Sequence, residues 1–196
     1  AVGVETCGNI SADKAASPAS ALGRSKRIAE QLGSGFAAKC SGTYRSVRVG
    51  NVLGGRGSGL LSVQEQIRQG GPITVTDPDV RRFFRTIPEA CQLILQAAAS
   101  ASHGAIYTLD MGEPVLIRVL AEQMIRLAGK VPDRDIAIIY TGMRPGEKLH
   151  ETLFYSDEDY RPTSHPKILE AGMRTFSVDQ VLGNIPRLRE SVAVYD

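Results

Sequence analysis

Short β-type segments alternate with amphipathic helical segments along the chain, and this alternation constrains the fold more than any other feature. The segments typical of strands lie at residues 7–11, 47–52, 72–80, 104–112 and 135–142. The segments with helical spacing of apolar residues lie at 21–39, 59–71, 86–100 and 115–129. Strand–helix–strand units build parallel sheets. We therefore predict an α/β fold, a parallel sheet with crossover helices.

The composition is that of a globular chain. It has 196 residues, of which 42% are hydrophobic, enough to bury the core of one domain with a small lobe. The net charge of +2 is too small to indicate nucleic acid or an anionic membrane as a partner. Cysteines at 7, 40 and 91 give neither a disulfide framework nor a zinc site, so we expect no metal and a reducing, cytoplasmic location. No apolar run approaches the ~20 residues of a membrane helix.

Asp13 and Lys14 follow directly after the first predicted strand. In open α/β sheets the reactive groups lie beyond the carboxyl ends of the strands, so this acid–base pair has a catalytic placement. An exposed turn with two solvated charges is the alternative. Lys26 lies on the next helix, and Leu22 occupies the position on the same helical face where many dehydrogenases have a tyrosine. These residues alone leave open whether the segment is an active site or only a loop and a helix.

A glycine-rich segment, 54–59, follows the second predicted strand. Its spacing does not fit GxGxxG, so it is either a loop close to a substrate or a flexible turn. Arginine forks suit diphosphate oxygens, and a nearby glutamate suits ribose hydroxyls. Arg81, Arg82 and Arg85, which flank the Phe83-Phe84 pair, and Arg144, which precedes PGEK, are therefore candidate nucleotide ligands. Taken singly, each arginine is also explained as a solvated surface charge.

Several long blocks between about residue 1 and about residue 170 occur in a characteristic order: SADKA, SPASALGRSKRIAE, VRVGNVLGGRGS, GGPITVTDPDVRRFFRTIPEACQLILQAA, GAIYTLDMGEPVLIRVLAEQMIRLAG, TGMRPGEKLHETL and PTSHPKI. In this order they closely resemble the nucleotide-sugar 4,6-dehydratases of polysaccharide biosynthesis. These are extended short-chain dehydrogenase/reductases that act on UDP-N-acetylglucosamine. The TIPEA block resembles most the large, membrane-anchored branch of the family.

The resemblance implies an internal redox cycle with NAD (or NADP) as cofactor: C4 of the sugar is oxidised, the C5 proton and the C6 hydroxyl leave, and C6 is then reduced. It implies that Asp13 protonates the departing hydroxyl, that Lys14 removes the C5 proton and that Lys26 holds the nicotinamide ribose. An adjacent acid and base stabilise each other's charged forms, which suits an elimination. The resemblance also implies a UDP-sugar pocket lined by Asn51, Arg56, Arg82, Arg144 and Glu147.

Two positions depart from the family pattern. Ala12 stands where the pattern has a threonine whose hydroxyl can bond the C4 oxygen. Leu22 stands where it has tyrosine, or methionine in many membrane-anchored members. Leucine is close to methionine in shape, so Leu22 is compatible with that branch. Alanine removes a hydroxyl, and we therefore expect a slow enzyme or none.

The resemblance covers the C-terminal half of a catalytic domain. The GxxGxxG turn that seats the pyrophosphate of NAD belongs to the first strands of this fold, and residues 1–196 do not contain it. We therefore expect a partial Rossmann-type parallel sheet without its N-terminal NAD-binding strands, and a small C-terminal substrate lobe. Cofactor binding is expected only together with the missing half, so the chain alone should be inactive. It would be a fragment, a truncated gene product or a half that depends on a partner.

We divide the chain into three parts: 1–53, the end of the Rossmann-type domain with the active-site helix; 54–170, the substrate-binding lobe, with one strand at about 105–109 returning to the sheet; and 171–196, a tail. The predicted function is the C-terminal part of a UDP-N-acetylhexosamine 4,6-dehydratase (a lyase) of capsule, O-antigen or glycan biosynthesis. One alternative is a degenerate, non-catalytic module that binds nucleotide sugars or mediates assembly. Another is a nucleotide-sugar epimerase, which would need the hydroxyls absent at positions 12 and 22. The expected partner is a UDP-sugar, and the chain could form a homo-oligomer; full-length relatives can be anchored to the inner membrane.

Overall fold

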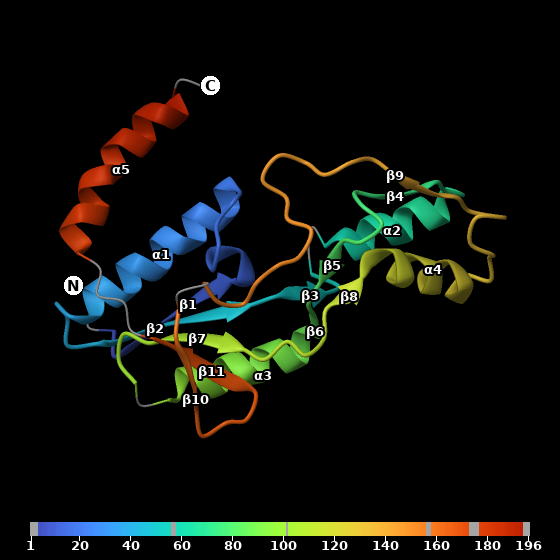
Figure 1. Cartoon of the computed structure of the whole chain (residues 1–196). Helices are drawn as coiled ribbons and strands as arrows, with labels where there is room; N and C mark the ends of the chain where they lie inside the picture. The colour runs from blue at the N-terminus through green and yellow to red at the C-terminus, as the bar shows by residue number, and fades with distance from the viewer. Residues whose placement is uncertain (1–3, 56–57, 101, 156–157, 173–176, 194–196) are drawn as a thin grey trace.

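Two lobes, each built around its own apolar core, form the structure (Figure 1). It is a computed structural model that describes residues 4–55, 58–100, 102–155, 158–172 and 177–193. The elements in chain order are β1 (Thr6–Ala12), the 3₁₀ turn η1 (Asp13–Ala15), α1 (Ala21–Ala37), β2 (Thr43–Val49), β3 (Asn51–Leu53), α2 (Gly59–Arg68), β4 (Ile73–Val75), β5 (Arg81–Arg82), β6 (Phe84–Thr86), α3 (Ile87–Ala98), β7 (Ile106–Leu109), β8 (Val115–Leu116), α4 (Ile117–Leu127), β9 (Ile138–Tyr140), β10 (Tyr160–Pro162), β11 (Ile168–Ala171) and α5 (Val178–Ala193).

The larger lobe contains a five-stranded sheet in the order β1-β2-β7-β11-β10. β1, β2 and β7 run parallel, whereas β11 is antiparallel to β7 and β10 is antiparallel to β11. The predicted parallel sheet is therefore confirmed for its first three strands. Besides the strand at 106–109, β10 and β11 (within residues 160–171) also return to this sheet. Ile168 of β11 joins the buried core, which favours this placement.

The alternation of side chains along β2 gives the sheet two different faces. Val47 and Val49 belong to the apolar core on the α3 side, together with Leu93 of α3. Ser46 and Arg48 are buried on the opposite side, which α1 covers (Figure 1). Successive side chains of a strand point to opposite faces. The sheet therefore has an apolar interface with α3 and a polar interface with α1.

Gly50 divides the predicted strand 47–52 into β2 and β3. A Cβ atom at this position would lie 2.8 Å from Cε of Met111 and 3.0 Å from Cβ of Phe83, closer than real Cβ contacts. Glycine allows the chain to pass between these side chains, and β3 then pairs in parallel with β6 instead of continuing in the main sheet. This break turns Asn51 away from the sheet, toward the junction of the two lobes.

The smaller lobe packs α2 and α4 against the parallel pair β4 and β9 (Figure 1). Helical spacing in α2 and α4 and alternation in β4 supply most of its buried residues, and Val80 and Ile136 come from segments between the elements. The buried residues are Val63, Ile73, Val75, Val80, Ala121, Ile125 and Ile136. This second core, separate from that of the sheet, makes a distinct wall that faces the carboxyl ends of β1 and β2.

Capping side chains start the helices where the sequence predicts. The hydroxyl of Ser20 accepts from the backbone N–H of Gly23 at 3.1 Å and so begins α1. Thr86 begins α3 in the same way, with Pro88 in the first turn, where its missing N–H costs no hydrogen bond. These caps fix the ends of α1 and α3 that lie nearest the lobe junction.

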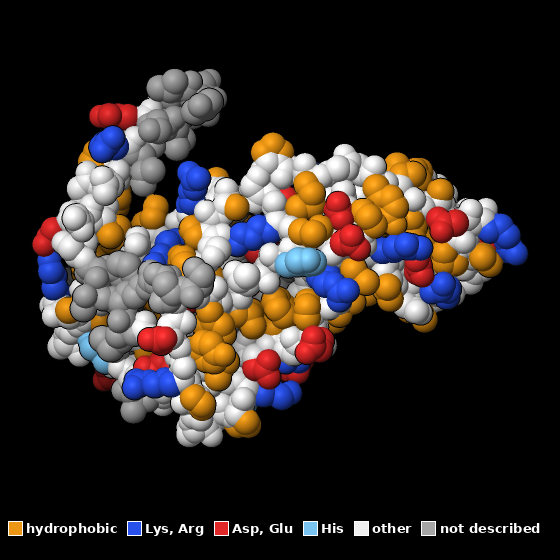
Figure 2. Space-filling model, viewed as in Figure 1, with side chains coloured by type: hydrophobic (Ala, Val, Ile, Leu, Met, Phe, Trp, Pro, Cys, Tyr) orange, Lys and Arg blue, Asp and Glu red, His pale blue; other side chains and the backbone are white. Residues whose placement is uncertain are grey.

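Acidic and basic side chains are intermixed over the face shown in Figure 2, which agrees with the net charge of +2. Among the described helices, none is long and apolar enough to span a bilayer. In the same part of the chain, no three His, Cys, Asp or Glu side chains are grouped as they would be around a metal ion.

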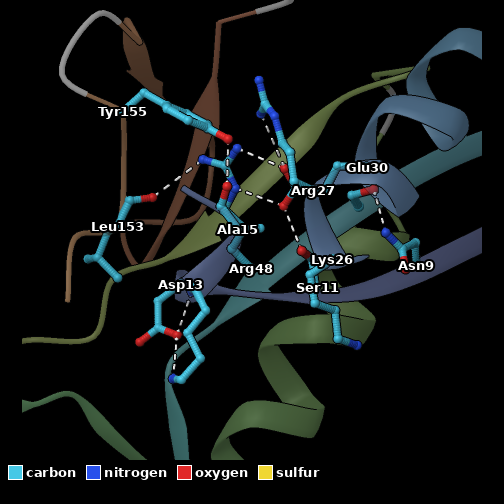
Figure 3. A network of polar contacts seen from close by, with 12 residues as sticks. Asn9, Ser11, Asp13, Ala15, Lys26, Arg27, Glu30, Arg48, Leu153 and Tyr155 are labelled. Atoms are coloured by element: carbon cyan, nitrogen blue, oxygen red, sulfur yellow. Dashed lines mark hydrogen bonds and ion pairs between the residues drawn. The ribbon is translucent and has the colours of Figure 1, made fainter. Parts of the chain in front are cut away.

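The polar interface beneath α1 is organised around the fully buried Arg48 (Figure 3). Its Nε and Nη2 donate to the two carboxylate oxygens of Glu30, both at 2.9 Å, and its Nη1 donates to Glu158 at 2.6 Å. The hydroxyl of Ser11, near the end of β1, donates to Glu30 at 2.6 Å. Burial disfavours the charged guanidinium, but the hydrogen bonds to Glu30 and Glu158 outweigh it and raise the pKa of Arg48 above its ordinary value.

We predict that Arg48→Ala destabilises the chain by about 3–5 kcal/mol, because it leaves the carboxylates of Glu30 and Glu158 buried without their counter-ion. Urea denaturation followed by circular dichroism measures the change. Arg68→Ala, which removes an exposed partner of Glu65 on α2, is the matched control and should leave the midpoint nearly unchanged. Equal midpoints for the two variants would show that the Arg48 network does not stabilise the fold.

Candidate active site

A cleft of about 870 Å³ lies between the two lobes. Its lining comes from the ends of β1 and β2 and from β3 on one side, and from α2, β4 and α4 on the other. The carboxyl ends of parallel strands meet at one edge of a sheet, so polar residues just beyond them gather there. The lining includes six residues singled out from the sequence: Asp13, Lys14, Asn51, Arg82, Arg144 and Glu147.

The Asp13–Lys14 pair lies in η1, the turn that directly follows β1. Asp13 is fully buried, and its Oδ1 accepts from both the backbone N–H of Lys14 at 2.8 Å and the Lys14 Nζ at 3.0 Å. Lys14 Nζ also donates to Oδ1 of Asn51 at 3.1 Å. The side chain of Lys14 is 27% exposed, so its amine is accessible from the cleft. The structure thus presents an amine beside a buried carboxylate, an arrangement suited to proton transfer.

A second charged group lies on the smaller-lobe side of the cleft. Arg82 Nη2 contacts Oε1 of Glu147 at 3.1 Å, and the hydroxyl of Thr76 donates to the same oxygen at 2.8 Å. Oε2 of Glu147 accepts from the backbone N–H of Arg144 at 3.3 Å. Glu147 therefore ties β4, β5 and the loop at 141–149 together. The residue Arg144 is exposed at the rim, where its guanidinium can meet an incoming anion.

Lys26 lies outside the cleft lining. Its Nζ donates to the backbone carbonyl of Ile10 on β1 at 3.0 Å. Leu22, one turn earlier on α1, does line the cleft, and Leu22 and Ile10 are each 55% exposed. Lys26 is thus an ammonium group beside exposed apolar surface at the edge of the cleft. The remaining predicted residue, Arg56, lies outside the described residues.

Tyr155 fixes the turn that carries the acid–base pair (Figure 3). Its hydroxyl donates to the carbonyl of Ala15 at 2.6 Å, and its ring packs against the guanidinium of Arg27, whose Cζ lies 4.2 Å from the ring centre. Burial raises the pKa of Tyr155 above its ordinary value, so the phenol stays a hydrogen-bond donor. Residue 155 is close to Glu158, which holds Arg48, so the turn rests on the same network as β2.

The family of this chain follows from its sequence as a whole. The profile of the polysaccharide biosynthesis protein family matches residues 1–173. The chain belongs to this family. The prediction of a polysaccharide biosynthesis family from the ordered blocks is therefore confirmed.

Two bacterial polysaccharide biosynthesis proteins are similar in sequence. Capsular polysaccharide biosynthesis protein CapD of Staphylococcus aureus is 48% identical over 160 residues, which cover 81% of this chain and 26% of CapD. The probable polysaccharide biosynthesis protein EpsC of Bacillus subtilis is 45% identical over 166 residues, which cover 85% of this chain and 28% of EpsC. The chain thus spans about a quarter of the length of these two polysaccharide biosynthesis proteins.

Among solved structures, Pen from Bacillus thuringiensis aligns with a TM-score of 0.78 and 30% identity, over 88% of this chain and 53% of Pen. Nucleotide-sugar epimerases and a dehydratase, several solved with NAD or a UDP-sugar, share the fold at 16–21% identity. The predicted partial Rossmann-type fold is confirmed by these neighbours. UDP-glucose 4-epimerases of Rickettsia match in sequence at 33–34% identity.

Several residues at this site were not predicted from the sequence. Thr76, Glu151 and Tyr155 carry contacts to the predicted residues, yet none stands at a spacing that points to chemistry. The block TGMRPGEKLHETL contains Glu151, and its density of charges was the one available signal. The contacts themselves join residues up to 140 positions apart, which no local pattern reveals.

We predict that Tyr155→Phe loosens the Asp13–Ala15 turn, because it removes the hydrogen bond to the Ala15 carbonyl. The expected loss of stability is about 0.5–1.5 kcal/mol, and amide hydrogen exchange should accelerate at residues 13–16 more than in α3. Mass-spectrometric hydrogen exchange measures this. Tyr140→Phe, at an exposed tyrosine of β9, is the control. Unchanged exchange at 13–16 in Tyr155→Phe would refute the role given to the phenol.

Proposed function

We propose that this chain carries the nucleotide-sugar site and the acid–base pair of a UDP-N-acetylhexosamine 4,6-dehydratase of polysaccharide biosynthesis. The observation that carries the proposal is the convergence of Asp13, Lys14 and Asn51 on one wall of a cleft whose other wall presents Arg82, Arg144 and Glu147. One wall offers proton-transfer groups and the other offers anion and hydroxyl ligands. A sugar attached to a nucleoside diphosphate needs both.

The smaller lobe would hold the nucleotide. The guanidinium groups of Arg82 and Arg144 suit the diphosphate, and the carboxylate of Glu147 suits hydroxyls of the ribose. In this structure the Glu147 carboxylate contacts Arg82 and Thr76, so a bound nucleotide would replace one or both of these contacts. The apolar lining from α2 and α4 would face the base. The sugar would then lie toward the ends of β1 and β3.

The acid–base pair would carry out the elimination. Lys14 takes the proton from C5, which a ketone at C4 acidifies, and Asp13 gives a proton to the C6 hydroxyl as it leaves as water. The two residues are held 3.0 Å apart, so each stabilises the charge that the other develops. Oδ1 of Asn51, at the start of β3, accepts a hydrogen bond from the Lys14 amine and so fixes the direction of that amine. This geometry supports one proton donor and one acceptor on the same face of the sugar.

NAD, when bound, supplies the acceptor that takes a hydride from C4 and returns it to C6. The residues of this chain that fit it are Lys26 and Leu22: the ammonium suits ribose hydroxyls, and the adjoining apolar surface suits a nicotinamide face. The NAD-bound neighbours of the same fold support this assignment.

A nucleotide-sugar 4-epimerase is the second candidate, favoured by the similarity to UDP-glucose 4-epimerases. Ala12 and Leu22 put no hydroxyl where a C4 oxygen would be deprotonated, and this departure bears on the C4 oxidation of the epimerase and of the dehydratase alike. A non-catalytic nucleotide-sugar-binding module is the third. The three differ in what they do to a sugar that is already oxidised at C4: only the dehydratase has a base for the C5 proton.

We predict that this chain catalyses exchange of the C5 proton of a UDP-linked 4-keto-6-deoxy-N-acetylhexosamine in D₂O. This substrate already carries the ketone, so this partial reaction needs no redox cofactor, unlike the complete dehydration of UDP-N-acetylglucosamine, for which the chain alone is expected to be inactive. Lys14→Ala should reduce exchange to the rate in buffer, whereas Glu122→Gln, at a carboxylate that pairs with Arg118 and Arg126, should exchange normally. Mass spectrometry of the sugar gives the rate. No exchange by the unsubstituted chain would contradict the proposed function, and full exchange by Lys14→Ala would show that another group is the base.

We predict that Arg144→Ala weakens binding of UDP-N-acetylglucosamine by about 1.5–3 kcal/mol, the range for a hydrogen bond to a charged group. Arg144 is chosen because its exposed side chain can be removed without disturbing the Arg82–Glu147 pair. Calorimetry with the 196-residue chain measures the affinity. Arg134→Ala, at an exposed arginine paired with Asp135, should bind as the unsubstituted chain does. Equal affinities for both variants would remove Arg144 from the site.

A further inference from the structure

A second carboxylate, that of Glu151, lies near the Lys14 amine. Oε1 of Glu151 lies 3.8 Å from Lys14 Nζ, and the Glu151 side chain is 6% exposed. Glu151 is not part of the cleft lining, and in the chain it lies in the segment that follows the 141–149 loop. It therefore contacts the base of the proposed reaction without meeting the substrate.

Ion pairs, not hydrogen bonds, hold the carboxylate of Glu151. Its Oε2 lies 3.7 Å from Nζ of Lys148, and both of these atoms are buried without a hydrogen-bond partner among the described residues. A buried charged group is normally hydrogen-bonded, because burial without a partner is costly. Glu151 is thus placed between two ammonium groups at distances that a small movement would shorten to hydrogen bonds. The unpartnered oxygen, Oε2, faces Lys148, and the other oxygen, Oε1, faces Lys14.

The stereochemistry of the Lys14 amine explains a use for such a group. A neutral amine has two N–H bonds and one lone pair, and an ammonium has three N–H donors. Asp13 and Asn51 accept two of these donors, at 3.0 and 3.1 Å. The neutral amine is therefore satisfied, with its lone pair left for a proton. Once protonated, Lys14 carries a positive charge, and besides Asp13 the carboxylate of Glu151 is the one within 4 Å of its Nζ among the described ion pairs.

We propose that Glu151 is a positioning residue for Lys14, one that stabilises the ammonium formed in the proton-transfer step; this inference rests on the proposed function. In that step the C5–H bond breaks, its electron pair stays on the sugar as the enolate of the 4-ketone, and the proton forms the third N–H bond of Lys14. Glu151 keeps its own charge throughout. Its attraction for the new positive charge lowers the free energy of the charged state, and Lys148 holds it in place.

The test compares Glu151→Gln and Glu151→Asp in the 196-residue chain. The substrate is the UDP-linked 4-keto-6-deoxy-N-acetylhexosamine in D₂O, and C5 exchange is measured at saturating and at half-saturating concentrations. Glutamine keeps the shape and removes the charge, so the saturated rate should fall about tenfold to a hundredfold, while the half-saturation concentration and the affinity for UDP-N-acetylglucosamine stay unchanged. Aspartate keeps the charge and should restore most of the rate. Glu122→Gln is the matched control for loss of one carboxylate.

The outcomes separate this inference from the proposed function. Exchange at the normal rate in Glu151→Gln, with Lys14→Ala inactive, overturns the inference and leaves the proposed function standing. A lower melting temperature or weaker binding in both Glu151 variants, together with slower exchange, shows a structural residue and also overturns it. No exchange by the unsubstituted chain overturns the proposed function, and the inference falls with it.

Discussion

The buried guanidinium of Arg48 is the interaction on which the rest of the structure depends. It joins α1 through Glu30, β1 through Ser11 and the segment around residue 158 through Glu158. An arginine with no access to water is tolerated only if its donors are met by well-placed acceptors. The segments that supply these acceptors are therefore held in one arrangement. Tyr155 extends that arrangement to the carbonyl of Ala15, directly behind the acid–base pair.

The two walls of the cleft differ in how firmly their side chains are held, and this difference follows from the Arg48 network. The Asp13–Lys14 turn rests on hydrogen bonds to buried groups, so its geometry is set before any ligand arrives. On the opposite wall, Glu147 is shared between Arg82, Thr76 and the backbone of Arg144, contacts that a nucleotide could replace. In the proposed reaction, the Asp13–Lys14 turn would be preorganised for the transition state, whereas the contacts of Glu147 would change when the nucleotide binds. Stabilising the transition state more than the substrate requires such preorganised reacting groups.

The fold could be predicted where the chain obeys local rules. Strand and helix periods located the parallel strands and the helices α1 and α3, whose N-terminal caps are Ser20 and Thr86. β10 and β11 were not predicted: Tyr160–Pro162 is short, exposed and contains a proline, and Ile168–Ala171 has only four residues. Arg48 was missed as well: in a strand that alternates polar and apolar residues, an arginine is expected to face water. Its burial depends on Glu30 and Glu158, which are 18 and 110 positions away. The placement of Asp13 and Lys14 followed from the strand order and the roles of the site residues from the family resemblance, whereas Glu151 and Tyr155 emerged only from the three-dimensional structure.

A crystal structure of the 196-residue chain with UDP-N-acetylglucosamine tests the central claim most directly. The account predicts the diphosphate between Arg82 and Arg144, with C5 of the sugar about 3–3.5 Å from Nζ of Lys14, the separation of reacting atoms before proton transfer. It also predicts that Glu147 leaves Arg82 or Thr76 for the ribose. A UDP-sugar bound with its hexose away from Asp13 and Lys14, or on a surface outside the cleft, would contradict it.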